Sequence, residues 1–345
     1  MAPDITAVIP TYRRPKLLRR AVRSVLNQAA VSLMVRVFDN ASGDDTGAVM
    51  ADLANGESRL NYHCHQQNLG SAANFEYGLR SVDTPFFSLL SDDDYLLPDF
   101  YRQALDDLAK YPDAMFWAGL TLNVDECGKV WDARVDRWSR DGLYAPPEGL
   151  MAMMNGLAPA WTGIVFRREI LDSIGFPDKE ALGPSDLDFL LKAAASFPFV
   201  LRKHPSAVFT LNATSFSATQ PLSSFWPGWQ KMFCNIECNE ALGDFEKQRA
   251  LAALHKDAKS MLFRRGANVL SFGRYDFARG VADALQTDYG QLWRPLLLRV
   301  ITTACEQFSW FQRIYSKIYR LVERRLVNNR LDLQQRFGHL VSQVQ

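Results

Sequence analysis

The feature that most constrains the fold is the alternation of short apolar runs and helical patterns in the first hundred residues. The segments that separate and follow these runs have apolar residues at helical spacing. Examples are the segment that begins at Pro15, the segment that follows Gly70, and residues 98–110. Four runs have the length of a buried strand: 5–10, 33–38, 60–64 and 86–90. Strands and helices alternating at this pace predict an α/β protein with a parallel sheet.

The pattern changes further along the chain. Strands are expected at 114–122, 161–166 and 199–211, and helices at 148–156, 167–174 and 184–195. After about residue 220, long helical patterns with few Gly or Pro interruptions run to the end. We therefore predict a first domain over 1–220 and a helical C-terminal region over 221–345.

Composition excludes several other classes. The 345 residues are 48% hydrophobic and 22% charged with a formal net charge of +1, which argues against disorder and against a global field for nucleic acid. The five cysteines are scattered, so they are predicted to be reduced thiols. Cys234 and Cys238 lack zinc-finger spacing and are predicted to be buried. No signal peptide and no apolar stretch of about 18 residues is expected, so the predicted location is cytoplasmic.

Polar clusters follow three of the predicted strands, at 10–14, 39–40 and 91–94. Because ligands of parallel sheets bind beyond the carboxyl ends of the strands, these clusters favour a nucleotide pocket. Asp39 can accept a base N–H, and Tyr12 or Arg14 can stack or hydrogen-bond. The run 92–94 has three adjacent carboxylates, which Mg²⁺ or Mn²⁺ bridging a diphosphate would neutralise. The alternative is a solvated turn that caps the next helix.

The order of these motifs resembles the family 2 glycosyltransferases, which are inverting, nucleotide-sugar-dependent enzymes of the GT-A fold. The resemblance covers roughly residues 4–217. It is carried by AVIPTYRRPKLLRRAVRSVLNQ, VFDNASGDDT, QNLGSAANFEYGL, FFSLLSDDDYLLPDF and WTGIVFRREILDSIGFPDKEALGPSDLDFLLKAA. It implies a GT-A type, Rossmann-like mixed sheet flanked by helices, followed here by the mainly α-helical C-terminal region.

The resemblance also implies roles for single residues. The donor nucleotide would be bound by Pro10, Thr11, Tyr12, Arg14, Asp39, Asn68, Ser91 and Asp92. The divalent cation, Mn²⁺ or Mg²⁺, would be bound by Asp93 and Asp94. Counting back from Pro98 aligns the family's DXD motif with 91–93, and a shifted alignment gives 92–94. Asn212 stands where many relatives carry a histidine that supports the metal site, and His204 lies eight residues earlier.

A carboxylate near the acceptor hydroxyl is needed as general base, and GPSDLDFLLKA matches the segment that carries it in the family. Asp186 is the predicted base, and Asp188 is its competitor. Residues two apart on a helix point about 200° apart, so only one of the two can face the acceptor. Ser185 and Asp188 also have the spacing of a capping box. Trp161, Gly163 and Asp188 are candidate acceptor contacts; a core position is the alternative for Trp161.

The segment 294–330 has eight basic residues and two acidic ones, a local excess of six positive charges (8 − 2), interleaved with aromatic and aliphatic residues. This pattern suits a helix lying on an anionic membrane, which would make the protein peripheral on the inner face of the cell membrane. Two alternatives are a packed helical subdomain with a solvated basic face and a homo-oligomer interface.

These observations together predict sugar transfer from a nucleotide-diphospho sugar to a hydroxyl of a glycan or lipid-linked acceptor, in cell-surface polysaccharide synthesis. One alternative is a sugar-phosphate nucleotidyltransferase, although PTYRRPK lacks the glycines of that class's signature loop. The other is a glycan-binding or membrane-scaffold protein on a transferase-like fold. A nucleic-acid partner is not expected.

Overall fold

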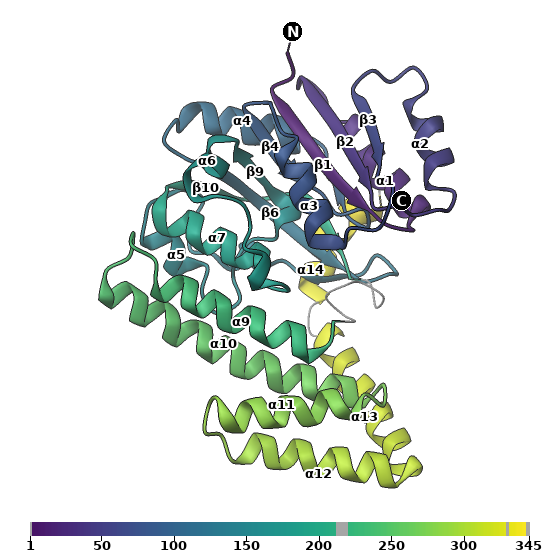
Figure 1. The fold of residues 1–345 in the computed structure, drawn as a ribbon, viewed down its shortest axis with the longest axis vertical. Coiled ribbons are helices and arrows are strands. Elements are labelled where there is room, and N and C mark those ends of the chain that lie inside the picture. Colours follow the sequence, from purple (N-terminus) through teal and green to yellow (C-terminus); the bar gives the residue numbers. More distant parts are fainter. Residues whose placement is uncertain (1, 212–219, 329–330, 343–345) are drawn as a thin grey trace.

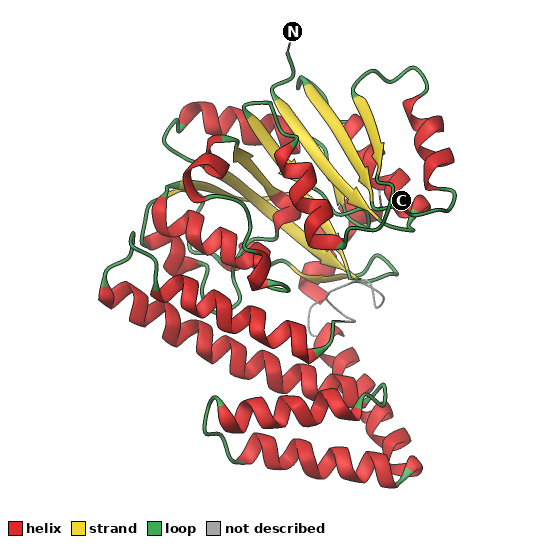
Figure 2. Cartoon of the chain, viewed as in Figure 1, coloured by secondary structure: helices red, strands yellow, loops and turns green. Residues whose placement is uncertain are grey.

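The computed structural model describes residues 2–211, 220–328 and 331–342. A mixed sheet with helices on both faces forms the upper part of the molecule in Figure 1, and the lower part is entirely helical, as Figure 2 shows. The strand order is β3-β2-β1-β4-β9-β6-β10-β5, with β7 beside β6 and β8 beside β10. The strands are β1 (Ile5–Thr11), β2 (Leu33–Asp39), β3 (Leu60–Cys64), β4 (Phe86–Leu89), β5 (Tyr95–Leu96), β6 (Phe116–Val124), β7 (Val130–Asp132), β8 (Gly142–Tyr144), β9 (Ile164–Arg167) and β10 (Phe199–Thr210).

Strand direction departs from the parallel sheet that the alternating pattern alone predicts. The strands β1 to β4 are parallel to their neighbours in that half of the sheet, and β6 pairs with β10 in parallel. Between β4 and β6 lies β9, which is antiparallel to both. The mixed GT-A type sheet is therefore confirmed, whereas a purely parallel one is wrong.

Helices of the N-terminal part cover the two faces of this sheet. They are α1 (Pro15–Leu26), α2 (Thr46–Ala54), α3 (Ser71–Arg80), α4 (Phe100–Lys110), α5 (Glu148–Ala152), α6 (Glu169–Ile174) and α7 (Ser185–Ser196), with 3₁₀ turns η1 (Arg134–Arg137), η2 (Trp161–Gly163) and η3 (Lys179–Ala181). Apolar residues alternate along β1, so that Ile5, Ala7 and Ile9 join the core under α1 and α4, while Val8 joins the core under α3. Helix α1 has Pro15 at its first position, which suits its fixed φ.

The expected strand at 161–166 begins only at Ile164, because Trp161–Gly163 forms the 3₁₀ turn η2. Helix α2 was not anticipated from the sequence. Only Thr46 and Met50 of its nine residues are buried, so it lacks the apolar periodicity that would reveal it.

The C-terminal region contains α9 (Leu222–Glu237), α10 (Asp244–Leu270), α11 (Tyr275–Thr287), α12 (Trp293–Gln307), α13 (Ser309–Asn328) and α14 (Leu331–Ser342). Its apolar residues continue the core of the sheet domain without a break, through Ile236 and Leu254 to Leu285 and Leu298. Helix α14 returns to the sheet domain, where the Val130 N–H donates to Gln334 Oε1 at 2.8 Å. The described helices include none that is both long and apolar enough to span a membrane.

The prediction of buried thiols at Cys234 and Cys238 is wrong. Both side chains are exposed, and Cys305 is the buried cysteine among the described residues. On α9 the buried face is formed by Met232, Phe233 and Ile236, and the two cysteines lie outside it.

Candidate active site

The loop that follows β1 and the turn that follows β4 meet at Asp92. The Thr11 hydroxyl donates to Asp92 Oδ2 at 2.7 Å, and the Tyr12 N–H approaches the same oxygen at 3.4 Å. Arg14 Nη1 lies 3.1 Å from Asp92 Oδ1 and 2.7 Å from Asp93 Oδ2. The structure therefore brings together residues about eighty positions apart that the sequence analysis assigned to one pocket.

Burial and charge act in opposite directions on this cluster. Burial raises the pKa of Asp92, and this outweighs the hydrogen bond from Thr11 and the charge of Arg14. Burial alone would lower the pKa of the Arg14 guanidinium. The negative charges of Asp92 and Asp93 outweigh this effect, so the pKa is raised. The cluster thus holds a permanent cation against two adjacent carboxylates at the end of β4.

Asp94 occupies a different environment from its two neighbours. It is fully buried, and its oxygens accept hydrogen bonds from the Thr162 hydroxyl and, at 2.8 Å, from the Thr210 N–H. Burial, reinforced by the charge of Asp93, raises its pKa to about 8. Asp94 therefore joins the turn after β4 to η2 and to the end of β10, which is a positioning task.

The turn from Ser91 to Asp94 is closed by a hydrogen bond from the Asp94 N–H to the Ser91 carbonyl at 3.1 Å. Arg20 of α1 supports this turn, because its Nη2 donates to the Asp93 carbonyl at 2.5 Å and to Thr210 Oγ1 at 3.1 Å. Its guanidinium also lies over the Tyr95 ring, with Cζ 4.5 Å from the centroid. Arg20 and Thr210 were missed in the sequence, because nothing local links residues 190 positions apart.

The end of β2 forms the next part of the candidate site. Asp39 is 2% exposed; its Oδ1 accepts from Ser42 N at 2.9 Å and from Ser42 Oγ at 2.6 Å, and its Oδ2 accepts from the Tyr62 hydroxyl at 2.6 Å. Burial and the adjacent carboxylate raise the pKa of Tyr62, which keeps it a donor. A carboxylate has about four lone-pair positions, so Asp39 retains one for a further N–H donor.

Asn68 lies beside this strand end. Its Oδ1 accepts from Asn40 Nδ2 at 3.0 Å and from the Gly70 N–H at 2.8 Å. Gly70 has a φ of 84°, which favours glycine at the start of α3. The loop after β1 is fixed to the loop after β2, because the Arg13 N–H donates to Ser42 Oγ at 2.8 Å. Pro10 is buried within β1, opposite Phe38 of β2.

The donor set suits a cation that is shared with a substrate. Among the described residues, no three His, Cys, Asp or Glu side chains gather in a way that would hold a metal alone. Asp92 and Asp93 are adjacent, and they follow the carboxyl end of β4. Mg²⁺ commonly takes one or two carboxylates and completes its shell with phosphate oxygens and water, so these residues fit a metal brought together with a diphosphate.

Asp186 and Asp188 have different surroundings, as their spacing predicts. Asp186 is exposed in the first turn of α7, and its Oδ1 accepts from the Leu187 N–H at 2.7 Å. The protein around it still desolvates the carboxylate, and this raises its pKa more than the charge of Arg134 lowers it. A raised pKa makes Asp186 a stronger base than an ordinary aspartate.

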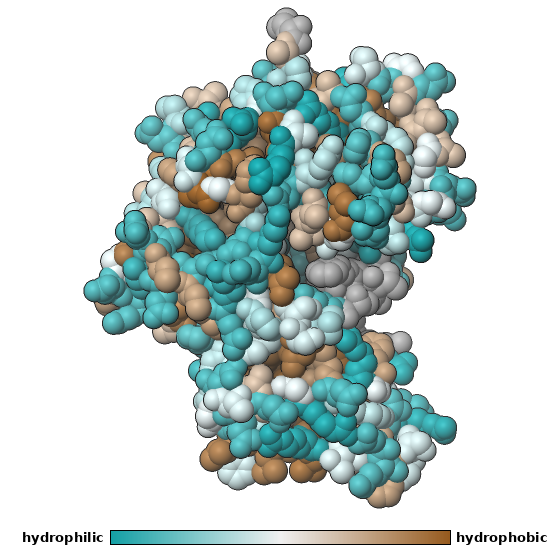
Figure 3. Space-filling model, viewed as in Figure 1, coloured by the Kyte–Doolittle hydropathy of each residue, from teal (hydrophilic) through white to brown (hydrophobic). Residues whose placement is uncertain are grey.

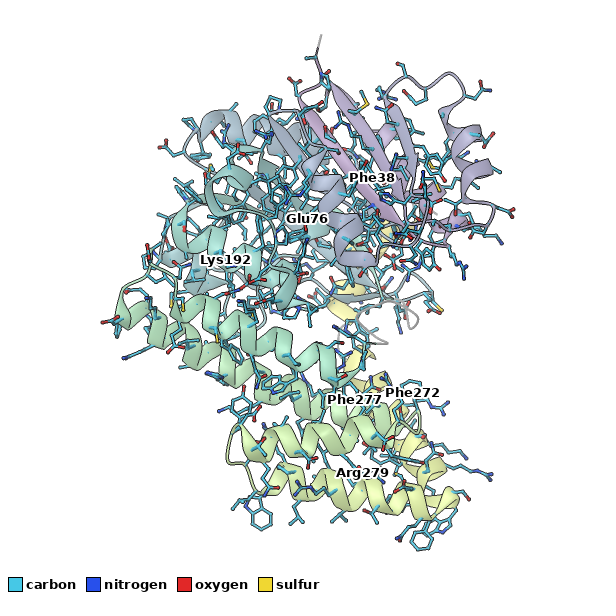
Figure 4. The ribbon with its side chains drawn as sticks, in the orientation of Figure 1. Phe38, Glu76, Lys192, Phe272, Phe277 and Arg279 are labelled. Atoms are coloured by element: carbon cyan, nitrogen blue, oxygen red, sulfur yellow. The ribbon has the colours of Figure 1, made fainter. Side chains whose placement is uncertain are left out.

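Asp188 is fully buried. Asn235 Nδ2 of α9 lies 2.9 Å from its Oδ1, and Lys192 Nζ, labelled on α7 in Figure 4, lies 2.9 Å from its Oδ2. The expected capping box is absent here, because the Asp188 N–H bonds to the Pro184 carbonyl and the carboxylate faces α9 instead. Asp188 therefore ties α7 to α9.

The candidate acceptor residues lie in and near η2. Trp161 is half-buried, with its ring centroid 5.8 Å from that of Phe166 and 5.5 Å from that of Phe189. A Cβ added to Gly163 would lie 2.3 Å from Thr121 Oγ1, so the absence of a side chain there is required by packing against β6. Packing therefore explains why residue 163 is a glycine, and it explains why part of the Trp161 side chain is buried.

Asn212 and His204 are the two remaining residues that the sequence analysis considered for the metal site. Asn212 lies outside the described residues. His204 is exposed on β10, and its carbonyl accepts from the Ser206 hydroxyl at 2.8 Å.

Comparisons with known proteins agree with this architecture. A family model for "Glycosyl transferase family 2" matches residues 6–175. The chain is 34% identical over 96 residues to the GalNAc(5)-diNAcBac-PP-undecaprenol beta-1,3-glucosyltransferase of Campylobacter jejuni, which is 28% of this chain and 31% of that protein. It is 32% identical over 120 residues to the succinoglycan biosynthesis protein ExoW of Rhizobium meliloti, which is 34% of this chain and 38% of that protein. These matches span about a third of either relative.

A solved structure resembles nearly the whole chain. The crystal structure of residues 1–349 of S. aureus TarS in complex with UDP-GlcNAc has a TM-score of 0.63 and 14% identity, covering 93% of this chain and 92% of that one. At this identity the likeness shows the fold. Residues 6–175 of the N-terminal domain are thus similar to glycosyl transferase family 2.

Proposed function

We propose that this protein transfers a sugar from a nucleotide-diphospho sugar to a hydroxyl group of a glycan or lipid-linked acceptor, with inversion at the anomeric carbon. The observation that carries the proposal is the convergence of Thr11, Tyr12 and Arg14 on Asp92 and Asp93 after the carboxyl end of β4. The site lies where open α/β sheets bind ligands.

Each part of the site has a task in this reaction. Asp39 accepts an N–H of the nucleotide base, and Asp93, with Asp92 beside it, binds the divalent cation. Asp94 holds the turn that carries them. When bound, Mn²⁺ or Mg²⁺ neutralises charge on the departing diphosphate. Asp186 takes the proton of the acceptor hydroxyl as its oxygen bonds to the anomeric carbon and the bond to the diphosphate breaks, so that a nucleoside diphosphate leaves.

The acceptor class rests on the relatives. The Campylobacter protein is named for an undecaprenol-linked acceptor, and ExoW is named for succinoglycan biosynthesis. A glycan or lipid-linked acceptor in cell-surface polysaccharide synthesis is the class that these names share. The base of the donor stays open, because the solved relatives include a UDP-GlcNAc complex and a complex with GDP-Man and Mn²⁺.

A panel of nucleotide sugars tests the proposal. Release of nucleoside diphosphate from UDP-glucose, UDP-GlcNAc and GDP-mannose is measured with Mn²⁺, with Mg²⁺ and with EDTA. At least one nucleotide sugar should raise the melting temperature and be slowly hydrolysed, and EDTA should stop the hydrolysis. A wider panel in which no nucleotide sugar binds would contradict the proposal and favour a non-enzymatic role for the fold.

A further inference from the structure

The largest concentration of exposed apolar side chains lies far from the candidate active site, on α12 and α13. Eleven of the eighteen exposed large hydrophobic residues among the described ones fall between 292 and 322, and they are 47% to 83% exposed. They are Leu292, Trp293, Leu296, Leu297, Val300, Phe308, Trp310, Ile314, Ile318, Leu321 and Val322. In the sheet domain the four such residues are at most 44% exposed. We call this set the 292–322 apolar face.

The face follows from the helical spacing. On α12 the buried side is formed by Pro295, Leu298, Thr302 and Cys305, and the exposed apolar residues recur on the opposite side at three- and four-residue intervals. Figure 3 shows apolar surface along the lower edge of the molecule, where α12 lies in Figure 1. A depression on this side is lined by Val300, Thr303, Ala304, Phe308 and their neighbours.

Helix α13 continues the face around a corner. The Phe308 and Trp310 ring centroids are 6.1 Å apart where the two helices join. The opposite side of α13 packs inward, since the Tyr315 hydroxyl donates to the Ala267 carbonyl at 2.9 Å and the Ser316 hydroxyl to the Ser271 carbonyl at 3.0 Å. The exposed apolar residues Ile314, Ile318, Leu321 and Val322 of α13 are 47% to 59% exposed.

Basic side chains border the face. Arg313, Lys317 and Arg320 are exposed, and their spacing of four and three residues places them along one edge of α13. Arg294 and Arg299 lie on either side of the α12 stripe by the same helical geometry. Within 292–322 there are five cations and one anion, Glu306. Glu306 is ion-paired with Arg279 of α11, labelled in Figure 4, and Arg299 is ion-paired with Asp283 of the same helix, which leaves Arg294, Arg313, Lys317 and Arg320 as the cations that border the face.

We propose that the 292–322 apolar face lies on an anionic lipid bilayer. The apolar residues would enter the boundary between headgroups and acyl chains, and the bordering cations would contact lipid phosphates. The exposed indoles of Trp293 and Trp310 suit the headgroup level, where one end of a side chain is apolar and the other is wet. A second copy of this face would bring cations toward cations, whereas anionic lipid neutralises them. Charge therefore favours a bilayer over self-association.

Vesicle co-sedimentation of the full chain tests the proposal, and it needs no enzymatic activity. The protein should bind phosphatidylglycerol vesicles, bind phosphatidylcholine vesicles much more weakly, and lose affinity as salt rises. These wild-type comparisons do not depend on the folding of any variant. Failure to bind phosphatidylglycerol vesicles, or equal binding to both lipids, overturns the proposal.

Two variants locate the binding surface. The triple change Arg313→Glu, Lys317→Glu and Arg320→Glu should weaken partitioning onto phosphatidylglycerol by about 100-fold or more, from the usual contribution of each basic residue near such a surface. The matched control is Arg23→Glu, Lys110→Glu and Lys256→Glu, three exposed cations elsewhere. Equal loss in both triples overturns the assignment to α13.

The apolar contribution is tested with Leu297→Ser and Ile314→Ser together, with melting curves to confirm folding. This variant should also lose vesicle binding. Sedimentation velocity is run on the same samples. A wild-type dimer that binds no vesicles and dissociates in this variant would overturn the proposal and identify the face as a contact between copies of this chain.

Discussion

Three consecutive aspartates at one strand end would repel one another if all were ionised and unpaired. The structure separates their environments. Asp92 and Asp93 lie against Arg14, whereas Asp94 is buried with a pKa raised to about 8 by that burial. Burial thus disfavours the charged form of Asp94, and Asp92 and Asp93 are the carboxylates that remain to face a cation. This assignment follows the alignment of 91–93, rather than 92–94, with the family motif.

The three carboxylates can be told apart by two single changes. Asp93→Asn should weaken Mn²⁺ binding in the presence of nucleoside diphosphate by more than about 10-fold, because it removes a charged oxygen ligand. Asp94→Asn should leave Mn²⁺ affinity within a factor of about 3, since a neutral amide resembles the protonated carboxyl and can still accept from the Thr210 N–H. Titration calorimetry with Mn²⁺ measures both. The opposite pattern would show that Asp94 is the ligand.

Single residues also mark the limit of prediction from sequence. The polar residues at the ends of β1, β2 and β4 could be found, because they follow apolar runs and because parallel strands place them at one edge. Thr162 and Arg20 could not be found. Their partners Asp94 and Thr210 are distant in the chain, and only the folded sheet brings them within hydrogen-bonding distance.

Among the elements, α9 holds in place α7, the helix that carries Asp186, and we call this set of contacts the α9–α7 contact. Asn235 Nδ2 donates to Asp188 Oδ1 at 2.9 Å and to Asp178 Oδ2 at 3.0 Å, and Lys231 Nζ lies 2.7 Å from Glu180 Oε2 of η3. A Cβ at Gly228 would lie 2.2 Å from the Ala181 carbonyl oxygen, so α9 and η3 are in direct contact. The proposed base is thus positioned partly from beyond the domain boundary predicted near residue 220.

Weakening the α9–α7 contact should affect turnover more than donor binding. Asn235→Leu leaves two carboxylates without their amide donor, so the free energy of unfolding should fall by about 1–3 kcal/mol. The turnover number should fall severalfold while the Kd for the donor stays the same, because the donor pocket is built from other strands. Gln230→Ala on the same helix is the control, since Gln230 contacts Asp288, the residue that follows α11, instead. Equal effects of the two variants on turnover would show that the α9–α7 contact does not position Asp186.

At the scale of the whole molecule, the sequence indicated a helical C-terminal region but not its path. The described chain runs down through α9 and α10 to α12, and α14 then returns to the sheet domain (Figure 1). Arg336 forms two contacts of 2.8 Å with Asp136 there, and Phe337 is 8% exposed. Helical periodicity identifies each helix, but it carries no information on which distant surface the helix will cover. The antiparallel insertion of β9 was hidden for the same reason.

The returning helix should contribute to the stability of the sheet domain. Phe337→Ala removes a largely buried ring from the shared core and should lower the free energy of unfolding by about 3 kcal/mol. The exposed change Leu331→Ala, on the same helix, should cost little. Chemical denaturation followed by tryptophan fluorescence measures both. A Phe337→Ala protein as stable as the wild type would mean that α14 is not held against the sheet domain in solution.

The proposal that Asp186 removes the acceptor proton in a sugar transfer is tested with Asp186→Asn. With the donor found in the panel, turnover should fall by roughly 10²–10⁴-fold while donor Kd and melting temperature stay near wild type. In the wild type, kcat/KM should fall on acidification with an apparent pKa above that of an ordinary aspartate, because desolvation by the surrounding protein raises the pKa of Asp186 and the protonated form cannot act as base. Asp188→Asn should instead lower the melting temperature. Wild-type turnover in Asp186→Asn, with the acid limb of the pH profile intact, would show that another group takes the acceptor proton.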